Sequence, residues 1–557
     1  MDVVLAPVGD AVAMSRVPAG GAGGLTETLD WSQLPGRVRE LEALRPRWVW
    51  ADTSTAYPRL LDASVRVERC RDLRLCHAIL ARSSYLGAPL DSVGDERWEP
   101  VDPVLLDPEP SLLDLPATGL EITLEEAVAE HDRQQRAVDQ SKQAARLRLL
   151  LAAESAGALV AAELKHVGLP WDEQVHDRQL AALLGPRPVL SGRPPKLEAL
   201  ADQVRAHLGA PALNPDSAPD LLRALHAAGV EVETTRQWEL ERMSHPVVEP
   251  LLEYKKLSRL LTANGWAWMA AWVSNGRFHP DYVPAGVVTG RWATRGGGAL
   301  QLPKQIRAAV VADPGYQLVV ADAAQLEPRV LAAMSRDELM ARASRGRDLY
   351  QSLVDDHIVD TRAHAKVAML GALYGATSGE AGQLMPRLLK AFPRATATVE
   401  EAARAGERGD VVTTWLGRSS PPVSAEWREA QLRGSQPEAT PADQRRARQR
   451  ARDWGRFTRN FVVQGTAAEW ALCWLADLRL RLLRLATSDG ARPELVYFLH
   501  DEVMVHSPVS LTAEVRAAIE AAARQAGELL FGSFPVEFAL DVRCVDNYAQ
   551  ASEPDPK

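Results

Sequence analysis

Residues 495–508 read LVYFLHDEVMVHSP, the clearest structural signal in the chain. Two apolar, strand-forming runs flank His500, Asp501 and Glu502, so the stretch predicts a hairpin with two acids at or near its turn. An Asp-rich turn can be a plain solvated tip. Here, however, apolar residues bury the hairpin on both sides of the acids, and buried carboxylates are costly unless a cation or hydrogen bonds compensate.

A second acid follows an apolar run in residues 316–334, YQLVVADAAQLEPRVLAAM. The run is typical of a buried strand, it ends at Asp322, and helical periodicity begins soon after. Asp322 is interpreted either as the cap of that helix or as a functional carboxylate at a strand end. Glu327 and Arg329 lie one to two turns further on, where nothing local requires them.

Residues 362–375 predict a helix with a distinctive face. Arg362, Lys366, Leu370 and Tyr374 recur at every fourth position and so lie on one side. The two cations suit a triphosphate, and the aliphatic and aromatic side chains suit a base and its sugar. The alternative is a surface helix with two solvated cations.

Bulk composition sets the class of protein. The chain has 557 residues, 46% hydrophobic and 25% charged, which predicts a soluble globular protein of two or more domains. Only four cysteines occur, and there is no CxxC zinc pair, no signal peptide and no apolar run long enough to cross a membrane, which favours the cytoplasm. The net charge is −9, yet seven arginines fall within residues 445–459. These arginines form either a solvated helix face or a contact to nucleic acid.

The order of elements predicts an α+β protein. A small α/β unit fills the first hundred or so residues, with strands around Gly9, and a Pro- and Asp-rich linker follows at residues 99–118. Helices dominate from about residue 120 to 272 and again to 484, separated by a strand-rich segment at 277–322. Strands return at the end of the chain.

The three signals, in this order, resemble the three polymerase motifs of family A DNA polymerases, the DNA polymerase I family. Residues 322–329 (DAAQLEPR) match DYSQIELR, and residues 362–375 match RxxxKxxxFGxxYG with Leu370 at the aromatic position. Residues 500–502 (HDE) match the third motif.

Two further segments resemble the same family. TGR at 289–291 with LQLP at 300–303 is similar to TGR…LQNIP. Arg456, Asn460 and QGTAA at 464–468 are similar to R…N…QGTAAD. The resemblance covers roughly residues 150–548.

The resemblance implies a multidomain α+β architecture. A right-hand polymerase fold would follow a small α/β, ribonuclease H-like domain that is a degenerate 3′–5′ exonuclease, with no 5′-nuclease domain. The expected boundaries are 1–118 for the exonuclease-like domain and 119–557 for the polymerase, with the thumb at about 150–275, the palm at about 277–335 and 455–557, and the fingers at about 336–454.

The implied activity is template-directed addition of deoxynucleotides to a DNA primer, in replication or repair, by an enzyme of the cytoplasm and nucleoid. Two Mg²⁺ ions, replaceable by Mn²⁺, would be held by Asp322, Asp501 and the backbone carbonyl of Ala323. Glu502 is counted with the catalytic acids, and Lys366 is the expected proton donor to pyrophosphate.

The remaining site residues follow from the same resemblance. Arg362 and Lys366 would grip the triphosphate, Tyr374 would pack on the nascent base pair, and Glu327 would exclude a 2′-hydroxyl. The nucleotide-binding set also includes Gln325, Leu370 and Tyr350. The expected DNA-binding residues are Arg291, Gln301, Arg456, Asn460, Gln464 and His500.

Several positions depart from the family pattern. Leu370 is expected to change discrimination between deoxy- and dideoxynucleotides. Ala323 and Ala324 remove two polar side chains beside the metals, which is expected to affect rate or fidelity. Tyr350 stands where the family has a Lys or His, so it is expected to do less electrostatic work on the triphosphate.

The N-terminal domain lacks most of the acids that exonuclease chemistry needs. Asp52 has no paired Glu, Ala56 stands at a second acid position, and Asp72 is the one candidate that remains. We therefore expect no proofreading. The alternatives are retained exonuclease activity, a polymerase specific for ribonucleotides, and an inactive DNA-binding scaffold.

Overall fold

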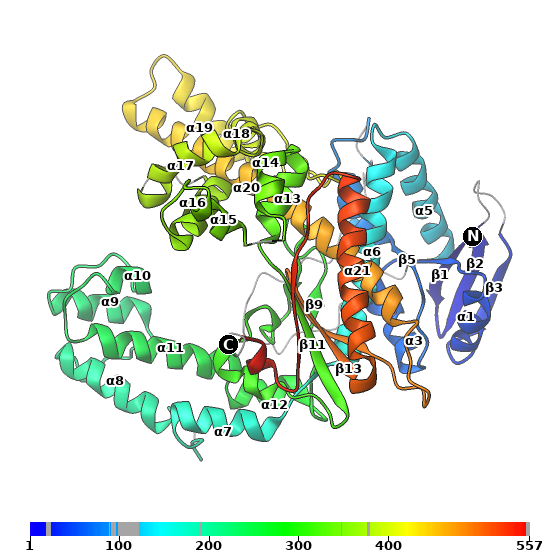
Figure 1. Ribbon diagram of the computed structural model, residues 1–557, viewed down its shortest axis with the longest axis horizontal. Coiled ribbons are helices and arrows are strands. Elements are labelled where there is room, and N and C mark those ends of the chain that lie inside the picture. The colour runs from blue at the N-terminus through cyan, green and yellow to red at the C-terminus, as the bar shows by residue number, and fades with distance from the viewer. Residues whose placement is uncertain are drawn as a thin grey trace. The chain divides into compact units, whose positions relative to one another are not determined.

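The computed structural model describes residues 1–17, 24–87, 90, 96–98, 122–189, 192–346, 348–375 and 379–552. The chain forms two compact units, each built from several stretches (Figure 1). The first unit contains Met1–His166, Tyr282–Arg295 and Val319–Cys544, and the second contains Val167–Asp281, Gly296–Leu318 and Val545–Lys557. The linker expected at 99–118 lies outside the described residues.

A sheet and short helices open the first unit (blue in Figure 1). The elements are β1 (Asp2–Val8), β2 (Ala11–Val17), β3 (Thr26–Asp30), α1 (Leu34–Glu42), β4 (Arg47–Trp50), α2 (Thr53–Ala56), α3 (Pro58–Asp62), β5 (Cys70–Asp72), α4 (Leu73–Ala81) and α5 (Leu124–Asp139). The sheet order is β3-β2-β1-β4-β5. The hairpin predicted around Gly9 is confirmed, and β4 runs parallel to both β1 and β5.

The pattern of residues 70–87 (CRDLRLCHAILARSSYLG) predicts one helix, but residues 70–72 do not belong to it. They form β5 because they pair with β4 and bury all three side chains. Asp72 ends the strand and caps α4: its carboxylate accepts hydrogen bonds from the backbone N–H of Leu75 (3.0 Å) and of Thr53 (2.7 Å).

A buried ion pair joins this sheet to two long helices of the same unit, α6 (Ala144–Val167) and α20 (Pro441–Leu482). Arg479 on α20 donates to both carboxylate oxygens of Glu163 on α6, at 2.7 and 2.9 Å. It also donates to the carbonyls of Val67 (2.6 Å) and Glu68 (3.0 Å). Burial opposes ionisation of Glu163, but the nearby Arg479 charge outweighs it and lowers the Glu163 pKa.

A four-stranded sheet of order β12-β13-β11-β14 follows later in the chain. Its strands are β11 (Tyr316–Ala323), β12 (Glu494–Leu499), β13 (Glu502–Pro508) and β14 (Leu540–Val545). β12 and β13 form the antiparallel hairpin that the sequence predicted. The last strand begins at Leu540, later than the apolar pattern from residue 536 suggested. The helix α21 (Thr512–Phe531) packs against α20, where the Trp474 indole donates to the Ile519 carbonyl at 3.2 Å.

Helices fill the part of the first unit between β11 and β12. They are α13 (Leu326–Ser335), α14 (Glu338–Ala343), α15 (Leu349–Asp355), α16 (Arg362–Tyr374), α17 (Gly379–Ala391), α18 (Pro393–Glu407) and α19 (Ala425–Ser435). The apolar faces of α13 to α18 share a core with Phe461, Val462 and Val463 of α20. The polar residues 434–441 predict a break between helices, and the structure confirms it. There Thr440 and Asp443 form a capping box that starts α20.

A second buried ion pair, between Arg418 and Glu154 on α6, lies in the same unit. The Arg418 guanidinium packs against Gly290, where a Cβ would lie only 2.6 Å from its Nε. Beside it the buried Glu469 carboxylate accepts hydrogen bonds from the Thr414 hydroxyl and from the Leu416 N–H (2.9 Å). Burial raises the pKa of Glu469 to about 7.

This raised pKa predicts a pH-dependent stability. The folded state keeps the Glu469 proton to about pH 7, whereas the unfolded chain releases it near the ordinary value of 4.5. The contribution of Glu469 to stability therefore falls as the pH rises between these values and is constant above them. Relative to wild type, Glu469→Gln should gain on the order of 3 kcal/mol in unfolding free energy between pH 4 and 8. Urea denaturation at several pH values checks this, with the exposed Glu528→Gln as a control that should show no such trend.

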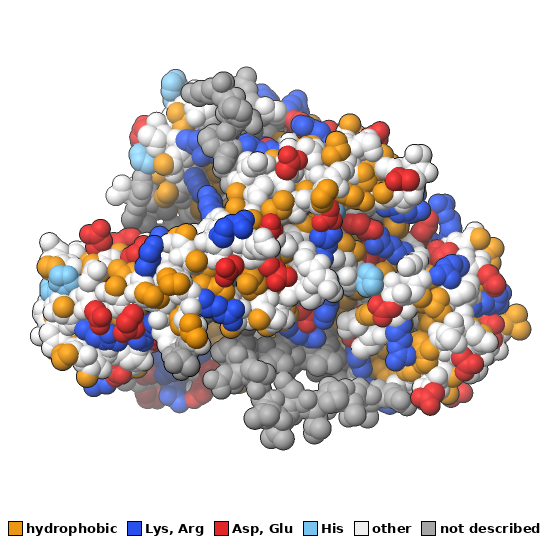
Figure 2. All heavy atoms as spheres, turned by 90° about the horizontal axis from the view of Figure 1, so that it is seen from below, with side chains coloured by type: hydrophobic (Ala, Val, Ile, Leu, Met, Phe, Trp, Pro, Cys, Tyr) orange, Lys and Arg blue, Asp and Glu red, His pale blue; other side chains and the backbone are white. Residues whose placement is uncertain are grey.

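The molecular surface is of mixed character. On the face drawn in Figure 2, acidic and basic side chains are interspersed with apolar ones. None of the helices in the described ranges combines the length and the apolar character that crossing a lipid bilayer requires.

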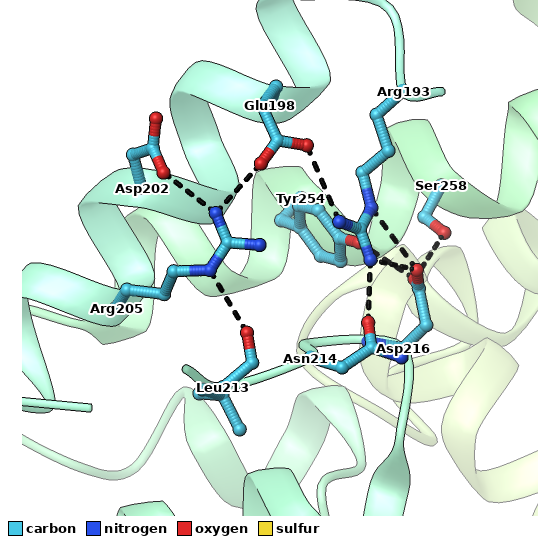
Figure 3. Close-up of polar contacts among 9 residues, drawn as sticks. All are labelled: Arg193, Glu198, Asp202, Arg205, Leu213, Asn214, Asp216, Tyr254 and Ser258. Carbon is cyan, nitrogen blue, oxygen red and sulfur yellow. Dashed lines mark hydrogen bonds and ion pairs between the residues drawn. The ribbon is translucent and has the colours of Figure 1, made fainter. Parts of the chain in front are cut away.

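The second unit is mainly helical. Its elements are β6 (Leu169–Pro170), α7 (Glu173–Leu184), α8 (Pro195–His207), α9 (Ala218–Ala227), α10 (Gln237–Leu240), α11 (Val248–Asn264), α12 (Trp266–Trp272), β7 (Val273–Ser274) and β8 (Arg277–Phe278). Figure 3 shows the polar contacts that hold α8 to its neighbours. Arg193 pairs with Asp216 (2.7 Å), whose carboxylate also accepts from Tyr254 of α11 (2.7 Å). Arg205 pairs with Glu198 and Asp202, both at 2.7 Å.

Candidate active site

The two predicted metal carboxylates lie at the same end of neighbouring strands. Asp322 is the penultimate residue of β11, and Asp501 lies in the two-residue turn between β12 and β13. The N–H of Ala323 donates to the backbone carbonyl of Asp501 at 2.8 Å, which fixes the turn against β11. Asp322 does not cap α13, because Gln325 stands at the N-cap position without a side-chain bond.

The electrostatics of this pair favour a cation. Burial raises the pKa of Asp322 to about 7, and repulsion by Asp501 and Glu502 adds to the shift. Burial likewise raises the pKa of Asp501. Two carboxylates that are costly to ionise together fit a divalent metal, which would neutralise them. Within the described residues no group of three or more His, Cys, Asp or Glu side chains is arranged as a metal site. Mg²⁺ often binds through one or two carboxylates plus substrate phosphates, so this donor set fits it.

Two residues of the site adopt left-handed backbone conformations. His500 in the hairpin turn has φ of 54°, and Gln325 before α13 has φ of 56°. Such conformations are uncommon for residues other than glycine and cost on the order of 1 kcal/mol or more. The tight turn between β12 and β13 imposes this conformation on His500, next to Asp501. The abrupt change from β11 to α13 imposes it on Gln325, three residues after Asp322.

The helix α16 confirms the predicted periodic face. It begins after Thr361, whose hydroxyl accepts from the N–H of His364 at 3.1 Å. Its apolar side, including Ala365, Ala368 and Met369, is buried. The opposite side carries the residues predicted to bind nucleotide, and Arg362, Lys366 and Tyr374 are exposed there, with Leu370 half-buried.

A cavity of about 340 Å³ brings eight of the predicted site residues together. Residues from the β12–β13 turn, α13, α15, α16, α20 and the segment at 290–292 all line it. The predicted residues among them are Arg291, Gln325, Glu327, Tyr350, Lys366, Leu370, His500 and Asp501. Trp292, Phe498 and the start of α13 supply apolar walls.

Glu327 is the centre of a hydrogen-bonded group at this cavity. Its carboxylate pairs with Arg291 and accepts a hydrogen bond from the Tyr374 hydroxyl at 3.0 Å. Gln464 on α20 also lies within hydrogen-bonding reach of that hydroxyl. Burial and the positive charge of Arg291 lower the pKa of His500 to about 4, so its imidazole is neutral at pH 7.

Asp348 is a site residue that the sequence analysis did not single out. Its carboxylate accepts from Arg362 Nε (2.6 Å), from the backbone N–H of Tyr350 (2.9 Å) and from Gln325. The Arg362 guanidinium also lies 5.7 Å from the centre of the Tyr350 ring. The available signal was an Asp immediately before a helix, which is the N-cap pattern.

The predicted DNA-binding residues occupy several elements. Arg456, Asn460 and Gln464 lie along α20, with Arg456 exposed and the other two half-buried. Gln301 ends the short 3₁₀ helix at Ala299–Gln301, which belongs to the second unit.

A structural comparison identifies the fold. The chain superposes on the "POL domain of Pol1 from M. smegmatis complex with DNA primer-template and dNTP" with a TM-score of 0.70, covering 99% of this chain and 96% of that one. The sequences are 18% identical, so this likeness establishes the architecture, that of a right-hand polymerase domain.

Sequence comparison then assigns the family. The chain belongs to DNA polymerase family A, whose profile matches residues 195–550. It is 28% identical over 339 residues to the thermostable DNA polymerase I of Thermus aquaticus, which covers 55% of this chain and 36% of that protein. It is 27% identical over 315 residues to the DNA polymerase I of Chloroflexus aurantiacus, covering 52% and 31%. The match thus spans about a third of the length of these relatives.

Proposed function

We propose that the protein is a template-directed DNA polymerase that adds deoxynucleotides to a primer 3′-hydroxyl. The observation that carries this proposal is that half-buried acids and a cationic helix face lie together at one cavity. Asp501 and Lys366 both line it, and Asp322 lies on the strand next to Asp501. Replication or repair of DNA in the cytoplasm, at the nucleoid, is the setting that this activity implies.

The carboxylates of Asp322 and Asp501, with the carbonyl of Ala323, would hold two Mg²⁺ ions, or Mn²⁺ in their place. Bound there, divalent cations supply charge neutralisation and activation of the primer hydroxyl. Glu502 adds a third negative group next to the pair, since it repels Asp322.

The α16 face would bind the incoming nucleotide. Lys366 and Arg362 are placed to hold the triphosphate, and Lys366 can give a proton to the departing pyrophosphate. Arg362 is held by Asp348 in the structure and would exchange this carboxylate for phosphate. Leu370, Tyr350 and Gln325 would complete the nucleotide pocket.

Glu327 would select the sugar. Its carboxylate is held by Arg291 and Tyr374, so it cannot easily turn away from a bound nucleotide. We expect Glu327→Ala to raise incorporation of ribonucleotides relative to deoxynucleotides by about tenfold to a hundredfold, because the space for a 2′-hydroxyl opens. Single-nucleotide extension kinetics measure this ratio. The exposed Glu338→Ala variant is the control. An unchanged ratio of ribonucleotide to deoxynucleotide incorporation in Glu327→Ala would exclude a role of Glu327 in selecting the sugar.

The remaining predicted residues would bind the primed template. Arg291 and Gln464 would donate hydrogen bonds to the similar minor-groove acceptors that every base pair presents. Asn460 and Arg456 would hold the strands, His500 would contact DNA as an uncharged imidazole, and Gln301 would do so from the second unit.

The N-terminal sheet would be an exonuclease-like domain without proofreading, within the expected boundaries 1–118 and 119–557. Asp72 supports this, because its carboxylate is buried and already accepts two backbone hydrogen bonds. Burial and repulsion by Asp52 raise its pKa to about 7, although the two backbone hydrogen bonds oppose this shift.

Primer extension with Mg²⁺ and the four deoxynucleotides tests the function, with incorporation read against each template base. Template-directed extension supports the proposal, and binding of primed DNA without extension would indicate a scaffold. Incubation without nucleotides tests the N-terminal domain. Shortening of the primer that disappears in Asp72→Ala would show retained exonuclease activity.

A further inference from the structure

The first half of α20 carries a row of arginines on one face. Arg445, Arg448, Arg452 and Arg456 are spaced by three, four and four residues, which places them one above another along the helix. All four are exposed. We refer to these four residues as the arginine stripe.

The other sides of this helical segment are covered by neighbouring helices. Thr458 donates to the Ala402 carbonyl of α18 at 2.7 Å, and Gly455 packs against the same helix. The Gln431 amide and the Trp427 indole of α19 donate to backbone carbonyls of α20 at 2.9 and 3.3 Å. The arginine stripe therefore lies on the side that packing leaves open.

The charges of the arginine stripe are largely uncompensated. Among the described residues, the side chains of Arg445 and Arg448 have neither a hydrogen-bond partner nor an ion pair, and Arg452 donates to the neutral amide of Gln449 (3.0 Å). Only Arg456 is paired, with Asp453. The whole chain has a net charge of −9, and acids and bases are interspersed on the face drawn in Figure 2. Against this background the arginine stripe creates a local positive electrostatic field.

One end of the arginine stripe lies at the candidate active site. A Cβ at Gly375 would lie 3.3 Å from Cγ of Arg456, and Gly375 follows Tyr374 at the end of α16. From Arg456 the stripe runs outward to Arg445. At a rise of 1.5 Å per residue, this is about 16 Å along the helix axis.

We propose that the arginine stripe binds the phosphates of the single-stranded template ahead of the nascent base pair. This inference rests on the proposed function. In primer extension the primer ends at the carboxylates, and only the template continues past the base pair that Tyr374 would contact. A row of exposed arginines that starts beside Tyr374, and of which only Arg456 has an acidic partner, matches the charge and the extended shape of that strand.

The test compares two primed duplexes that differ only in template overhang, one nucleotide against about ten. DNA affinity is measured between about 50 and 200 mM salt. Three phosphate contacts to a single strand should steepen the slope of log affinity against log salt by about 2 on the long overhang. Over this fourfold range of salt, that difference corresponds to about a 16-fold greater loss of affinity.

The triple variant R445Q/R448Q/R452Q should abolish the extra slope on the long overhang and leave binding of the short-overhang duplex unchanged. The matched control is R404Q/R428Q/R433Q, which removes the same charge from exposed positions on α18 and α19 and should keep the extra slope. An equal loss on both duplexes would assign the stripe to double-stranded DNA, and no loss on either would exclude nucleic-acid binding. Both results overturn the inference. Failure of wild type to extend the primer would refute the proposed function instead, because the salt slopes do not depend on catalysis.

Discussion

Asp501→Ala should abolish template-directed primer extension while leaving the binding of primed DNA largely intact. The variant removes one of the two half-buried carboxylates at this end of the sheet, Asp322 and Asp501, which we propose as ligands of the divalent cation at the end of the primer. Lewis-acid stabilisation is worth several kcal/mol, so we expect a loss of at least about a thousandfold in the rate of nucleotide addition. Single-turnover extension of a labelled primer measures the loss.

Asp541→Ala provides the matched control for this prediction. Asp541 is exposed on β14 and contributes to the repulsion that Asp322 experiences, but it does not line the cavity. A general effect of removing negative charge near Asp322 would appear in both variants. An Asp501→Ala protein that extends primers at close to the wild-type rate would exclude the proposed metal site.

Arg479→Met should destabilise the folded protein by about 3–5 kcal/mol, the usual effect of removing one partner of a buried ion pair. The variant leaves the Glu163 carboxylate buried without its counter-ion, and it leaves the carbonyls of Val67 and Glu68 without their donor. The midpoint of urea unfolding should fall accordingly.

Arg481→Gln is the control, because this nearby arginine on α20 is far more exposed and pairs only with Asp477. It should change stability by less than about 1 kcal/mol. The double variant Arg479→Met/Glu163→Met should recover part of the loss, since it removes both charges. A destabilisation of Arg479→Met no larger than that of Arg481→Gln would contradict the structural role of the pair.

Local patterns in the sequence predicted many elements correctly. The apolar runs around Asp501 predicted the hairpin, and the four-residue spacing from Arg362 to Tyr374 predicted α16. Both depend on contacts close in sequence. Only the family resemblance implied that Asp322 and Asp501 lie close together. The pairing of β11 with β13 is a long-range contact, and no local periodicity encodes it.

Other features depend on partners that are distant in sequence. Residues 70–72 directly precede a helix, but pairing with β4 makes them a strand. Arg479 resembles any other arginine on a helix until Glu163 is placed beside it. Asp348 is similar: an N-cap pattern is visible in the sequence, whereas its ion pair with Arg362 depends on how α15 packs against α16.

The buried arginines also bear on how the protein can be shortened. The segment that matches the family profile starts at residue 195, whereas the carboxylates that neutralise Arg418 and Arg479 belong to Glu154 and Glu163. A fragment excised at the profile boundary would keep both guanidinium groups and lose both counter-ions. The limits of sequence similarity are therefore not the limits of an independently folding piece, and a minimal active enzyme has to retain α6 and the strands that pack on it.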